Sequence, residues 1–546
     1  MKKEFDDIVF NFFDTETTGV GSGDQILQFG SIRADSELLD FIDKNNIFCK
    51  IRPDVIPHPM ATLTHKISLK TLNEKGLDEI EFARKINELM TERSFTCHLG
   101  YNTLRFDDQK IRELFFRNLI DPYSREWRNS NSRSDIFSLV KMINVIKPSV
   151  INWFYDDDGK KSLRLEHLAK VNNIKQTNAH DALSDVEATI GLAKLIKDNA
   201  PDIYNFFFKL RKKEFVAKYC CPMGSPFLYV GKGAEYEYNY ATVLLPLAIN
   251  HKNKNSVFCY DLRYDTSLLY GDYETVNKRL YSRRDNPELD RFPIMEVAIN
   301  QSPIVCPLSK ITDEVFERVR LDRNEVLERA NSILNSESGL ESPQSEIEKI
   351  NEFIDIILKN SYVNKDDDYY ARIYNRFYSN NERSLLDGMH LGNVDRWLNT
   401  ALLTGSNDIY NLTLRAVGNY NKNLLPDNLH GKCNPRNDYE EWMVSRWSDK
   451  SGLYGLTVDD FFSECKKVRG EMDLSDSEKT LLCELEDYIF EMSKTYNKNH
   501  NNDYLAFRLS SHDDCYNDSA RLSNKKTDKK ITKMIDVIDI DVEPDF

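Results

Sequence analysis

The chain has 546 residues, of which 40% are hydrophobic and 29% charged, and its formal net charge is −15. This length exceeds what one hydrophobic core supports, so we expect about three domains. The acidic excess counts against a nucleic-acid-binding protein, although a basic groove can coexist with an acidic exterior. The sequence has no apolar run long enough for a membrane helix and no N-terminal signal core, so we expect a cytoplasmic protein without a membrane partner. Ten cysteines without a CxxC pair argue against a zinc site or a disulfide framework.

Residues 1–198 show strand patterns, followed by an alternation of strand and helix patterns. Ser68 has the position of an N-cap before a short helix. Short apolar segments predict strands over 8–14, 25–33, 47–51 and 96–101. Apolar residues at helical spacing predict helices around 82–90, from Asp107 onward and over 181–197. This order predicts an α/β domain that ends near residue 198.

The pattern changes after residue 198. Short strands predicted over 227–230, 242–248, 257–262, 294–299 and 304–306 favour a small barrel or mixed β domain. Residues 335–346 have the composition of a linker, and helical patterns dominate from Ile347 to Lys494. The last segment combines a basic block with alternating acidic and apolar residues, which predicts a disordered tail. The expected domains are therefore 1–198, 199–347 and 348–495, with a tail over 496–546.

Two carboxylates end the first predicted strand. Asp14 and Glu16 are spaced i, i+2, so on a strand they share one face while Thr15 lies on the other. Adjacent anions repel each other unless a cation lies between them, and hard oxygen ligands suit Mg²⁺ or Mn²⁺. The alternative is a solvated strand end, which an isolated D-x-E pattern would favour.

Further polar motifs follow along the chain. Asp107 opens a helix after Asn102, and His180 precedes Asp185 at the start of another helix. Taken singly, Asp107 reads as an N-cap, His180 as a surface histidine and Asp185 as a solvated helix residue. The ordered combination D-x-E, N-x₃-F-D and H-x₄-D is improbable by chance and indicates one functional site.

These motifs resemble the DEDDh superfamily of 3′→5′ exonucleases, and residues 5–495 as a whole resemble the bacterial exodeoxyribonuclease I family. The resemblance implies an α/β RNase H-like exonuclease domain, followed by an SH3-like β-barrel domain and a helical C-terminal domain. The chain departs from the family at Thr15–Gly19, which is closer to the broad superfamily, and at Lys66, where many relatives carry glycine. The segments that carry the resemblance outside the acidic motifs include Gly100–Asn102, Asp121–Tyr123, Ile151–Trp153, Arg164–Leu168, Asn178–Ala182, Pro246–Ala248 and Tyr260–Leu262.

The resemblance also implies an activity, namely hydrolysis of single-stranded DNA from its 3′ end to 5′-mononucleotides, in DNA repair and recombination. It implies two Mg²⁺ ions, or Mn²⁺ in their place, with Asp14, Glu16 and Asp185 as direct ligands and Asp107 acting through a water molecule. His180 would be the general base, and since it must be neutral to accept a proton, we expect activity to fall in acid. Glu16 would also contact the terminal 3′-hydroxyl group.

Other candidate substrate-binding residues combine basic and aromatic side chains. Arg112, Tyr123 and Trp127 belong to a stretch that suits a single strand, because bases stack on rings while guanidinium groups meet phosphates. Lys141 would extend this path, and Arg164 would bind a phosphate. The alternatives are core positions for Tyr123 and Trp127 and a structural salt bridge for Arg164.

The family implies one protein partner, the single-stranded DNA-binding protein, whose C-terminus is acidic and ends in phenylalanine. The end of this chain, Glu543–Phe546, has a similar character, so the tail could occupy the same pocket. We expect a monomer that associates with the nucleoid when it acts.

Two other functions stay open. One is an RNA-trimming exoribonuclease of the same superfamily, since discrimination depends on contacts at the 2′-OH. The other is a single-strand-binding scaffold with a decayed nuclease domain. The presence of all the acidic residues and the histidine of the motifs argues against this alternative.

Overall fold

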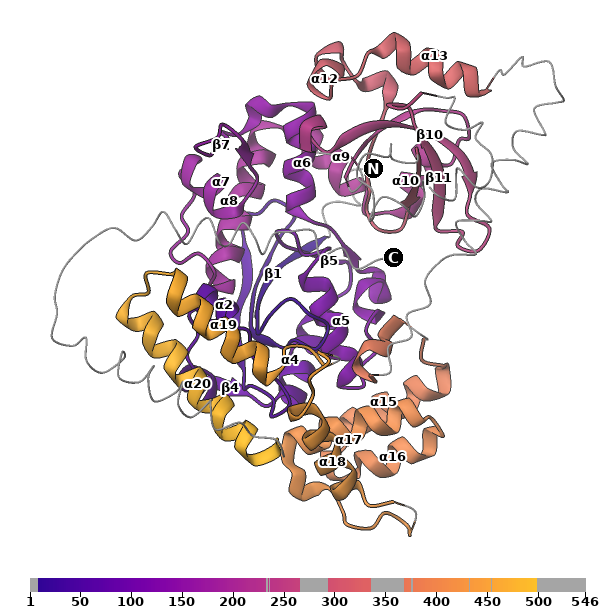
Figure 1. Ribbon diagram of the computed structural model, residues 1–546. Coiled ribbons are helices and arrows are strands. Elements are labelled where there is room, and N and C mark those ends of the chain that lie inside the picture. Colours follow the sequence, from indigo (N-terminus) through magenta and orange to yellow (C-terminus); the bar gives the residue numbers. More distant parts are fainter. Residues whose placement is uncertain are drawn as a thin grey trace.

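The computed structural model describes residues 8–231, 234, 236–265, 293–334, 368–374, 377–431, 433–452 and 454–497. Its elements form three groups in chain order, coloured from indigo to yellow in Figure 1. The predicted linker at 335–346, the start of the predicted helical region and the tail from residue 498 onward lie outside the described residues. None of the described helices is long and apolar enough to span a membrane.

A mixed sheet organises the first group. Among the described residues, six strands pair in the order β4-β3-β2-β1-β5-β6, with β1 antiparallel to β2 and parallel to β5. The third strand begins at Phe41, earlier than the predicted segment 47–51. The prediction missed this part because Asp43–Asn46 are polar and show no apolar alternation. The strands are β1 (Val9–Thr17), β2 (Ile26–Ala34), β3 (Phe41–Cys49), β4 (Gly76–Leu77), β5 (Thr96–Leu99) and β6 (Ser132–Arg133), with a separate hairpin of β7 (Phe154–Tyr155) and β8 (Lys161–Ser162).

Helices cover both faces of this sheet. On one face, Phe10 and Phe12 of β1 share a core with Val186 of α8. On the other face, Phe13 packs with residues of α4 and α5. Successive side chains of β1 therefore point alternately toward α8 and toward α5. The helices of this group are α2 (Pro59–His65), α3 (Leu69–Lys75), α4 (Glu79–Thr91), α5 (Asp107–Arg117), α6 (Ile136–Ile146), α7 (Leu165–Val171), α8 (Ala182–Asn199), α9 (Pro201–Lys209) and α10 (Lys213–Cys220).

The second group is a smaller β domain. Within 227–307, as far as the structure describes it, five strands pair in the order β12-β11-β10-β9-β13, and each corresponds to a predicted strand. Residues of α9 and α10 belong to the same apolar cluster as both sheets, so the core continues across the predicted boundary at residue 198. The elements are β9 (Phe227–Val230), β10 (Ala241–Ile249), β11 (Ser256–Asp261), β12 (Ile294–Ala298), β13 (Ile304–Pro307), α12 (Asp313–Arg318) and α13 (Arg323–Leu334).

The third group is helical and packs against the first (Figure 1). Met60 and Leu63 of α2 share a small apolar cluster with Val468 and Leu482 of α19 and α20. The helices are α15 (Asn380–Leu391), α16 (Trp397–Thr404), α17 (Asn407–Asn421), α18 (Pro435–Trp447), α19 (Val458–Glu471) and α20 (Asp476–Tyr496). Short 3-10 helices complete the described elements: η1 (Ser124–Glu126), η2 (Arg128–Ser130), η3 (Pro148–Val150), η4 (Tyr236–Tyr238), η7 (Leu308–Lys310), η8 (Tyr370–Tyr374), η9 (Val394–Arg396) and η10 (Lys422–Leu424).

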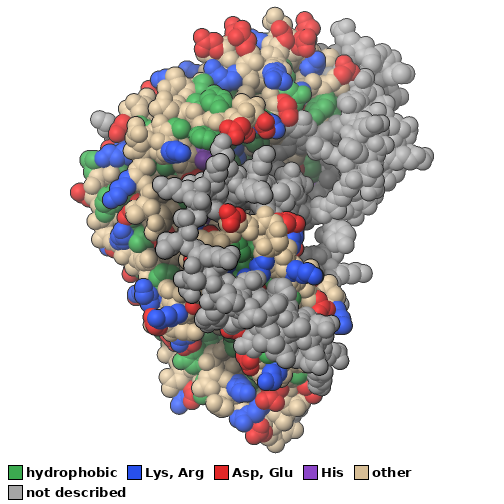
Figure 2. Space-filling view, turned by 60° about the vertical axis from the view of Figure 1, so that its left-hand side comes forward, with side chains coloured by type: hydrophobic (Ala, Val, Ile, Leu, Met, Phe, Trp, Pro, Cys, Tyr) green, Lys and Arg blue, Asp and Glu red, His purple; other side chains and the backbone are tan. Residues whose placement is uncertain are grey.

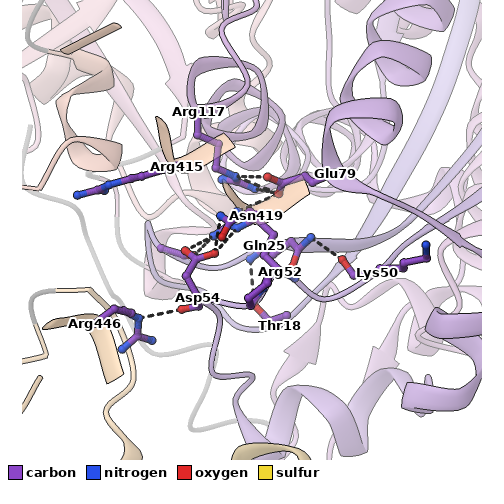
Figure 3. Close-up of polar contacts among 12 residues, drawn as sticks. Thr18, Gln25, Lys50, Arg52, Asp54, Glu79, Arg117, Arg415, Asn419 and Arg446 are labelled. Atoms are coloured by element: carbon purple, nitrogen blue, oxygen red, sulfur yellow. Dashed lines mark hydrogen bonds and ion pairs between the residues drawn. The ribbon is translucent and has the colours of Figure 1, made fainter. Parts of the chain in front are cut away.

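A buried polar network joins the first and third groups (Figure 3). Arg52 binds both carboxylate oxygens of Asp54, at 2.9 and 3.2 Å, and also binds Glu79 at 2.9 Å. From the helical group, Asn419 donates to Asp54 Oδ1, and Arg446 donates to the Asp54 carbonyl oxygen, each at 2.9 Å. Burial alone would raise the pKa of Asp54, but the Arg52 guanidinium outweighs it, so the pKa is lowered and the carboxylate stays charged.

The surface charge is not uniform. On the face that Figure 2 shows, lysine and arginine side chains are interspersed with acidic ones, while acidic side chains gather at the upper end. The exposed acidic residues of α12 and α13 lie at this end of the molecule. The net negative charge is therefore compatible with neutral or basic regions elsewhere on the surface.

Candidate active site

Three carboxylates meet where β1 ends. Asp14 and Glu16 continue the face of β1 that carries Phe10 and Phe12, and this face is covered by α8. Asp185 lies in the first turn of α8. One ligand atom from each of Asp14, Glu16 and Asp185 lies within 4.8 Å of the others, so oxygen ligands from two distant segments converge on one point.

The N-terminus of α8 is fixed to the sheet by Gln28 of β2. Its Nε2 donates to Asp181 Oδ2 at 3.0 Å, and its Oε1 accepts from the Ala182 amide at 3.3 Å. Asp181 also caps α8, because its Oδ1 accepts from the Ser184 amide. Beside it, a Cβ on Gly30 would lie 2.7 Å from the backbone of Ala182, so glycine permits the close approach. These contacts set the distance between Asp185 and β1.

Asp107 reaches the site from the opposite face. It is the first residue of α5, but the N-cap is Phe106, and no side-chain capping bond forms there. Instead, Asp107 Oδ1 accepts the Thr15 amide at 2.9 Å and the Thr15 hydroxyl at 2.6 Å. Asp135 holds the preceding loop by accepting the amides of Asn102 and Leu104. The interpretation of Asp107 as an N-cap is therefore wrong.

His180 lies in the turn before α8, with a left-handed backbone (φ 63°). Its amide donates to Asp185 Oδ2 at 3.2 Å, and Gln176 Nε2 donates to Asp185 Oδ1 at 2.7 Å. Both oxygens of Asp185 are thus oriented by neighbouring donors. The same contact fixes the backbone of His180 next to the carboxylate group.

The electrostatics favour a bound cation. Burial, followed by the neighbouring carboxylates, raises the pKa of Asp14 and of Glu16 well above their ordinary values. Burial raises the pKa of Asp107 to about 7 and that of Asp185 to about 6, against opposing hydrogen bonds from Thr15 and Gln176. Crowded, partly buried carboxylates of this kind are stabilised by hard divalent cations, whose charge offsets the repulsion. The donor set therefore fits a divalent metal centre.

Two of the basic residues predicted to contact DNA, Arg112 and Arg164, have acidic partners. Arg112 forms a two-bond ion pair with Glu126, at 2.6 and 2.9 Å, and its guanidinium lies 5.1 Å from the centre of the Tyr123 ring. Trp127 is 58% exposed. Lys141 lies over the Phe137 ring, and Arg164 lies 3.7 Å from Glu166. The roles of these residues in binding DNA remain predictions, and Trp127 is the most accessible of them.

The departure at Lys66 has a structural counterpart. Lys66 ends α2 with a left-handed backbone (φ 56°), the conformation in which glycine is favoured. Its Nζ lies 3.2 Å from Glu478 Oε1 in α20. Lysine at this position therefore adds an ion pair between the first and third groups.

Sequence reasoning did not assign roles to Thr15, Gln28, Gly30 or Gln176. Gln28 had a usable signal, because this polar residue stands between Leu27 and Phe29 in a predicted strand. Thr15 was placed correctly on the face opposite Asp14, but nothing in the sequence indicates that Asp107 lies on that face.

The sheet and the acidic group together define a nuclease of the exonuclease class, and residues 12–193 match the family model described as "Exonuclease". Residues 211–347 match the "Exonuclease I SH3-like domain". The chain is 34% identical to exodeoxyribonuclease I of Haemophilus influenzae over 385 residues, which cover 69% of this chain and 79% of the relative. It is 35% identical to the Escherichia coli protein of the same name, over 69% and 78% of the two chains. The chain belongs to the exodeoxyribonuclease I family.

Solved structures agree with this assignment over a longer span. Exonuclease I from Methylocaldum szegediense superposes with a TM-score of 0.79 at 29% identity, covering 89% of this chain and 100% of the other. E. coli exonuclease I in complex with a dA16 oligonucleotide gives a TM-score of 0.77 at 29% identity, over 89% and 99%. The predicted fold classes are thus confirmed: an α/β exonuclease domain, an SH3-like domain and a helical C-terminal region.

Proposed function

We propose that this member of the family removes 5′-mononucleotides from the 3′ end of single-stranded DNA with the help of two Mg²⁺ ions. The observation that carries the proposal is the convergence of Asp14, Glu16 and Asp185 within 4.8 Å. Relatives crystallised with DNA oligonucleotides support a single-stranded DNA substrate. A zinc-bound relative supports a divalent metal without identifying Mg²⁺.

Each side chain has a role in this proposal. Asp14, Glu16 and Asp185 would hold the two cations, which would supply a more acidic water and neutralise charge on the phosphate. Asp107 orients this water, and His180 accepts its proton as the general base. Glu16 also contacts the terminal 3′-hydroxyl, which would confine cleavage to free ends.

A degradation assay tests this function. Labelled single-stranded DNA with a free 3′ end should be converted to mononucleotides in Mg²⁺. A 3′-blocked oligonucleotide, addition of chelator and the variant Asp185→Ala should each abolish the release. RNA degraded faster than DNA would instead favour the RNA-trimming enzyme. Binding of a single strand without metal-dependent release would favour the decayed scaffold.

The proposal extends to partners and organisation on the strength of the family resemblance. The chain acts as a monomer at the nucleoid, and it binds the acidic C-terminus of the single-stranded DNA-binding protein. The domain boundaries 1–198, 199–347 and 348–495 are part of this proposal. A labelled peptide with that C-terminal sequence should bind in fluorescence anisotropy, and deletion of 498–546 should alter its affinity if the tail competes for the same pocket. Analytical ultracentrifugation tests whether the chain sediments with the mass of a monomer.

A further inference from the structure

The two neighbours of β1 end at different points. β2 pairs with β1 as far as Thr17, whereas β5 pairs with it only from Val9 to Phe12. The chain leaves the sheet at Gly100, where a Cβ would lie 2.2 Å from the Phe13 carbonyl oxygen. Past this point the edge of β1 that faced β5 has no strand partner among the described residues.

Asp107 takes the place of that missing strand. Its Oδ1 accepts the Thr15 amide, which belongs to the open edge, and the Thr15 hydroxyl. Thr15 is 5% exposed and Asp107 is 3% exposed, so water does not compete for these bonds. Both donors use the same oxygen, and a hydroxyl bond to a buried carboxylate at 2.6 Å is of the strong, charge-assisted kind. The orientation of the Asp107 carboxyl is therefore set by Thr15.

Thr15 also lies between the two residues proposed to bind metal. The side chains of Asp14 and Glu16 point toward α8, and that of Thr15 points toward α5, whose first residue is Asp107. Thr15 thus connects Asp14 and Glu16, on one face of the sheet, with Asp107, which comes from the other face.

We propose that Thr15 is a positioning residue, whose hydroxyl holds Asp107 in the orientation that completes the binding site for divalent cations. This inference rests on the proposed metal-dependent hydrolysis. Partners that orient groups around a metal typically contribute 10- to 100-fold in affinity or activity. The backbone amide bond persists in every variant, so a substitution at position 15 isolates the contribution of the hydroxyl.

The test compares Thr15→Val, which removes the hydroxyl at nearly constant volume, with Thr15→Ser, which retains it. Thr413→Val is the matched control, because Thr413 is also buried and its hydroxyl donates to the Ile409 carbonyl oxygen within α17, in the helical group. Binding of Mn²⁺ without DNA is measured by calorimetry, and the metal-induced rise in unfolding temperature is measured for each variant against its own chelated state. Turnover and KM for an oligonucleotide are measured over a Mg²⁺ titration.

For Thr15→Val we expect Mn²⁺ affinity to fall by about 10-fold or more, with lower turnover, unchanged KM for DNA and partial recovery at high Mg²⁺. Thr15→Ser and Thr413→Val should stay close to the wild type. Wild-type metal affinity in Thr15→Val, or equal losses in Thr15→Val and Thr15→Ser, would overturn the role of the hydroxyl while leaving the metal centre intact. A wild-type protein that binds no Mn²⁺ would overturn both the metal centre and this inference.

Discussion

Gln28 and Asp181 are 153 positions apart in the chain, yet the amide of Gln28 donates to the carboxylate of Asp181 at 3.0 Å. The same side chain accepts the first amide of α8. Gln28 of β2 therefore fixes the N-terminus of the helix that carries Asp185 to the sheet that carries Asp14 and Glu16, in addition to the apolar packing of α8 on β1. Geometry at the site depends on how closely α8 approaches β2.

Gly30→Ala is expected to disturb this approach. The added Cβ would lie 2.7 Å from backbone atoms of Ala182, which have no rotamer with which to move away. We expect a loss of about 1–3 kcal/mol in the free energy of unfolding, and a larger loss of metal affinity, since α8 must shift. Urea unfolding and Mn²⁺ calorimetry measure the two effects. Gly470→Ala in α19 is the control, because its added Cβ would meet nothing within 4 Å and should not lower the free energy of unfolding. Equal stability losses in the two variants would show that Gly30 is not required for the close approach of α8.

Asp185→Asn should change how stability depends on pH. Burial raises the pKa of Asp185 to about 6 and that of Asp107 to about 7, so in the folded chain both bind protons more tightly than when unfolded. In chelator, this contribution to stability is fully present below about pH 4 and is lost as pH rises through 6 to 7. Asparagine removes one charge from the cluster, so the variant should be more stable than the wild type at pH 8, by about 1–3 kcal/mol.

Urea unfolding in chelator at pH 5 and pH 8 measures this difference. On addition of Mg²⁺, the wild type should gain stability by mass action and the variant should gain little. A variant less stable than the metal-free wild type at pH 8 would show that the carboxylates do not repel each other as argued.

His180→Asn is expected to reduce turnover by about 10²–10⁴-fold, because the amide cannot accept the proton of the attacking water. Asparagine tolerates the left-handed backbone that His180 adopts, so the turn before α8 should persist. Single-turnover cleavage at saturating Mg²⁺ gives the rate, and Mn²⁺ calorimetry should show wild-type affinity. Undiminished turnover would exclude His180 as the base.

Asp54→Ala should destabilise the contact between the first and third groups. Removing one partner of a buried ion pair leaves the charge of Arg52 incompletely compensated, which costs about 3–5 kcal/mol. The variant also loses the bond from Asn419. The exposed pair of Arg323 with Asp313 is the control, since Asp313→Ala should change the free energy of unfolding by less than about 1 kcal/mol. Chemical denaturation followed by tryptophan fluorescence compares the two.

Trp127→Ala tests the predicted path of the single strand. The ring is 58% exposed, so its removal should leave the fold intact. If a base stacks on it, the affinity for single-stranded DNA should fall by about 1–3 kcal/mol, which fluorescence anisotropy detects. Arg112→Ala should instead destabilise the domain, because it breaks the ion pair with Glu126. Unaltered DNA affinity in Trp127→Ala would remove this residue from the path.

The parts of the fold that follow local rules could be predicted from the sequence. Alternation placed Asp14 and Glu16 on one face of β1, and the N-cap at Ser68 is confirmed by its bond to the Thr71 amide. The short strands of the SH3-like domain were found because each is apolar and bounded by polar turns. β3 was placed too late, since β4 pairs only with its last two residues, and the part of β3 before them needs no apolar pattern on its open edge.

The environment of the basic stretch 112–133 depends on contacts that sequence does not show. Arg112 meets Glu126 only because the chain between them folds back, and Arg125 is buried against Asp108 in the same way. A run of arginines therefore looks like a phosphate-binding surface until the acidic residues that accompany it are placed. The sequence motif identified Asp107 as a site residue, but its bond to Thr15 could not be predicted, because it depends on how β1 and α5 lie relative to each other.

The order of the site residues along the chain bears on how the protein matures during synthesis. Asp14, Glu16, Asp107, His180 and Asp185 are all present once translation has passed the end of α8. Phe208 of α9, which packs against Phe10 of β1, follows soon after, so the proposed catalytic centre can assemble on a nascent chain. The polar surface around Asp54 must wait for Asn419 and Arg446 from helices made much later. A ribosome-bound intermediate would thus carry all the proposed catalytic residues while the polar surface around Asp54 is still exposed. That surface would be covered only when the helices with Asn419 and Arg446 have emerged.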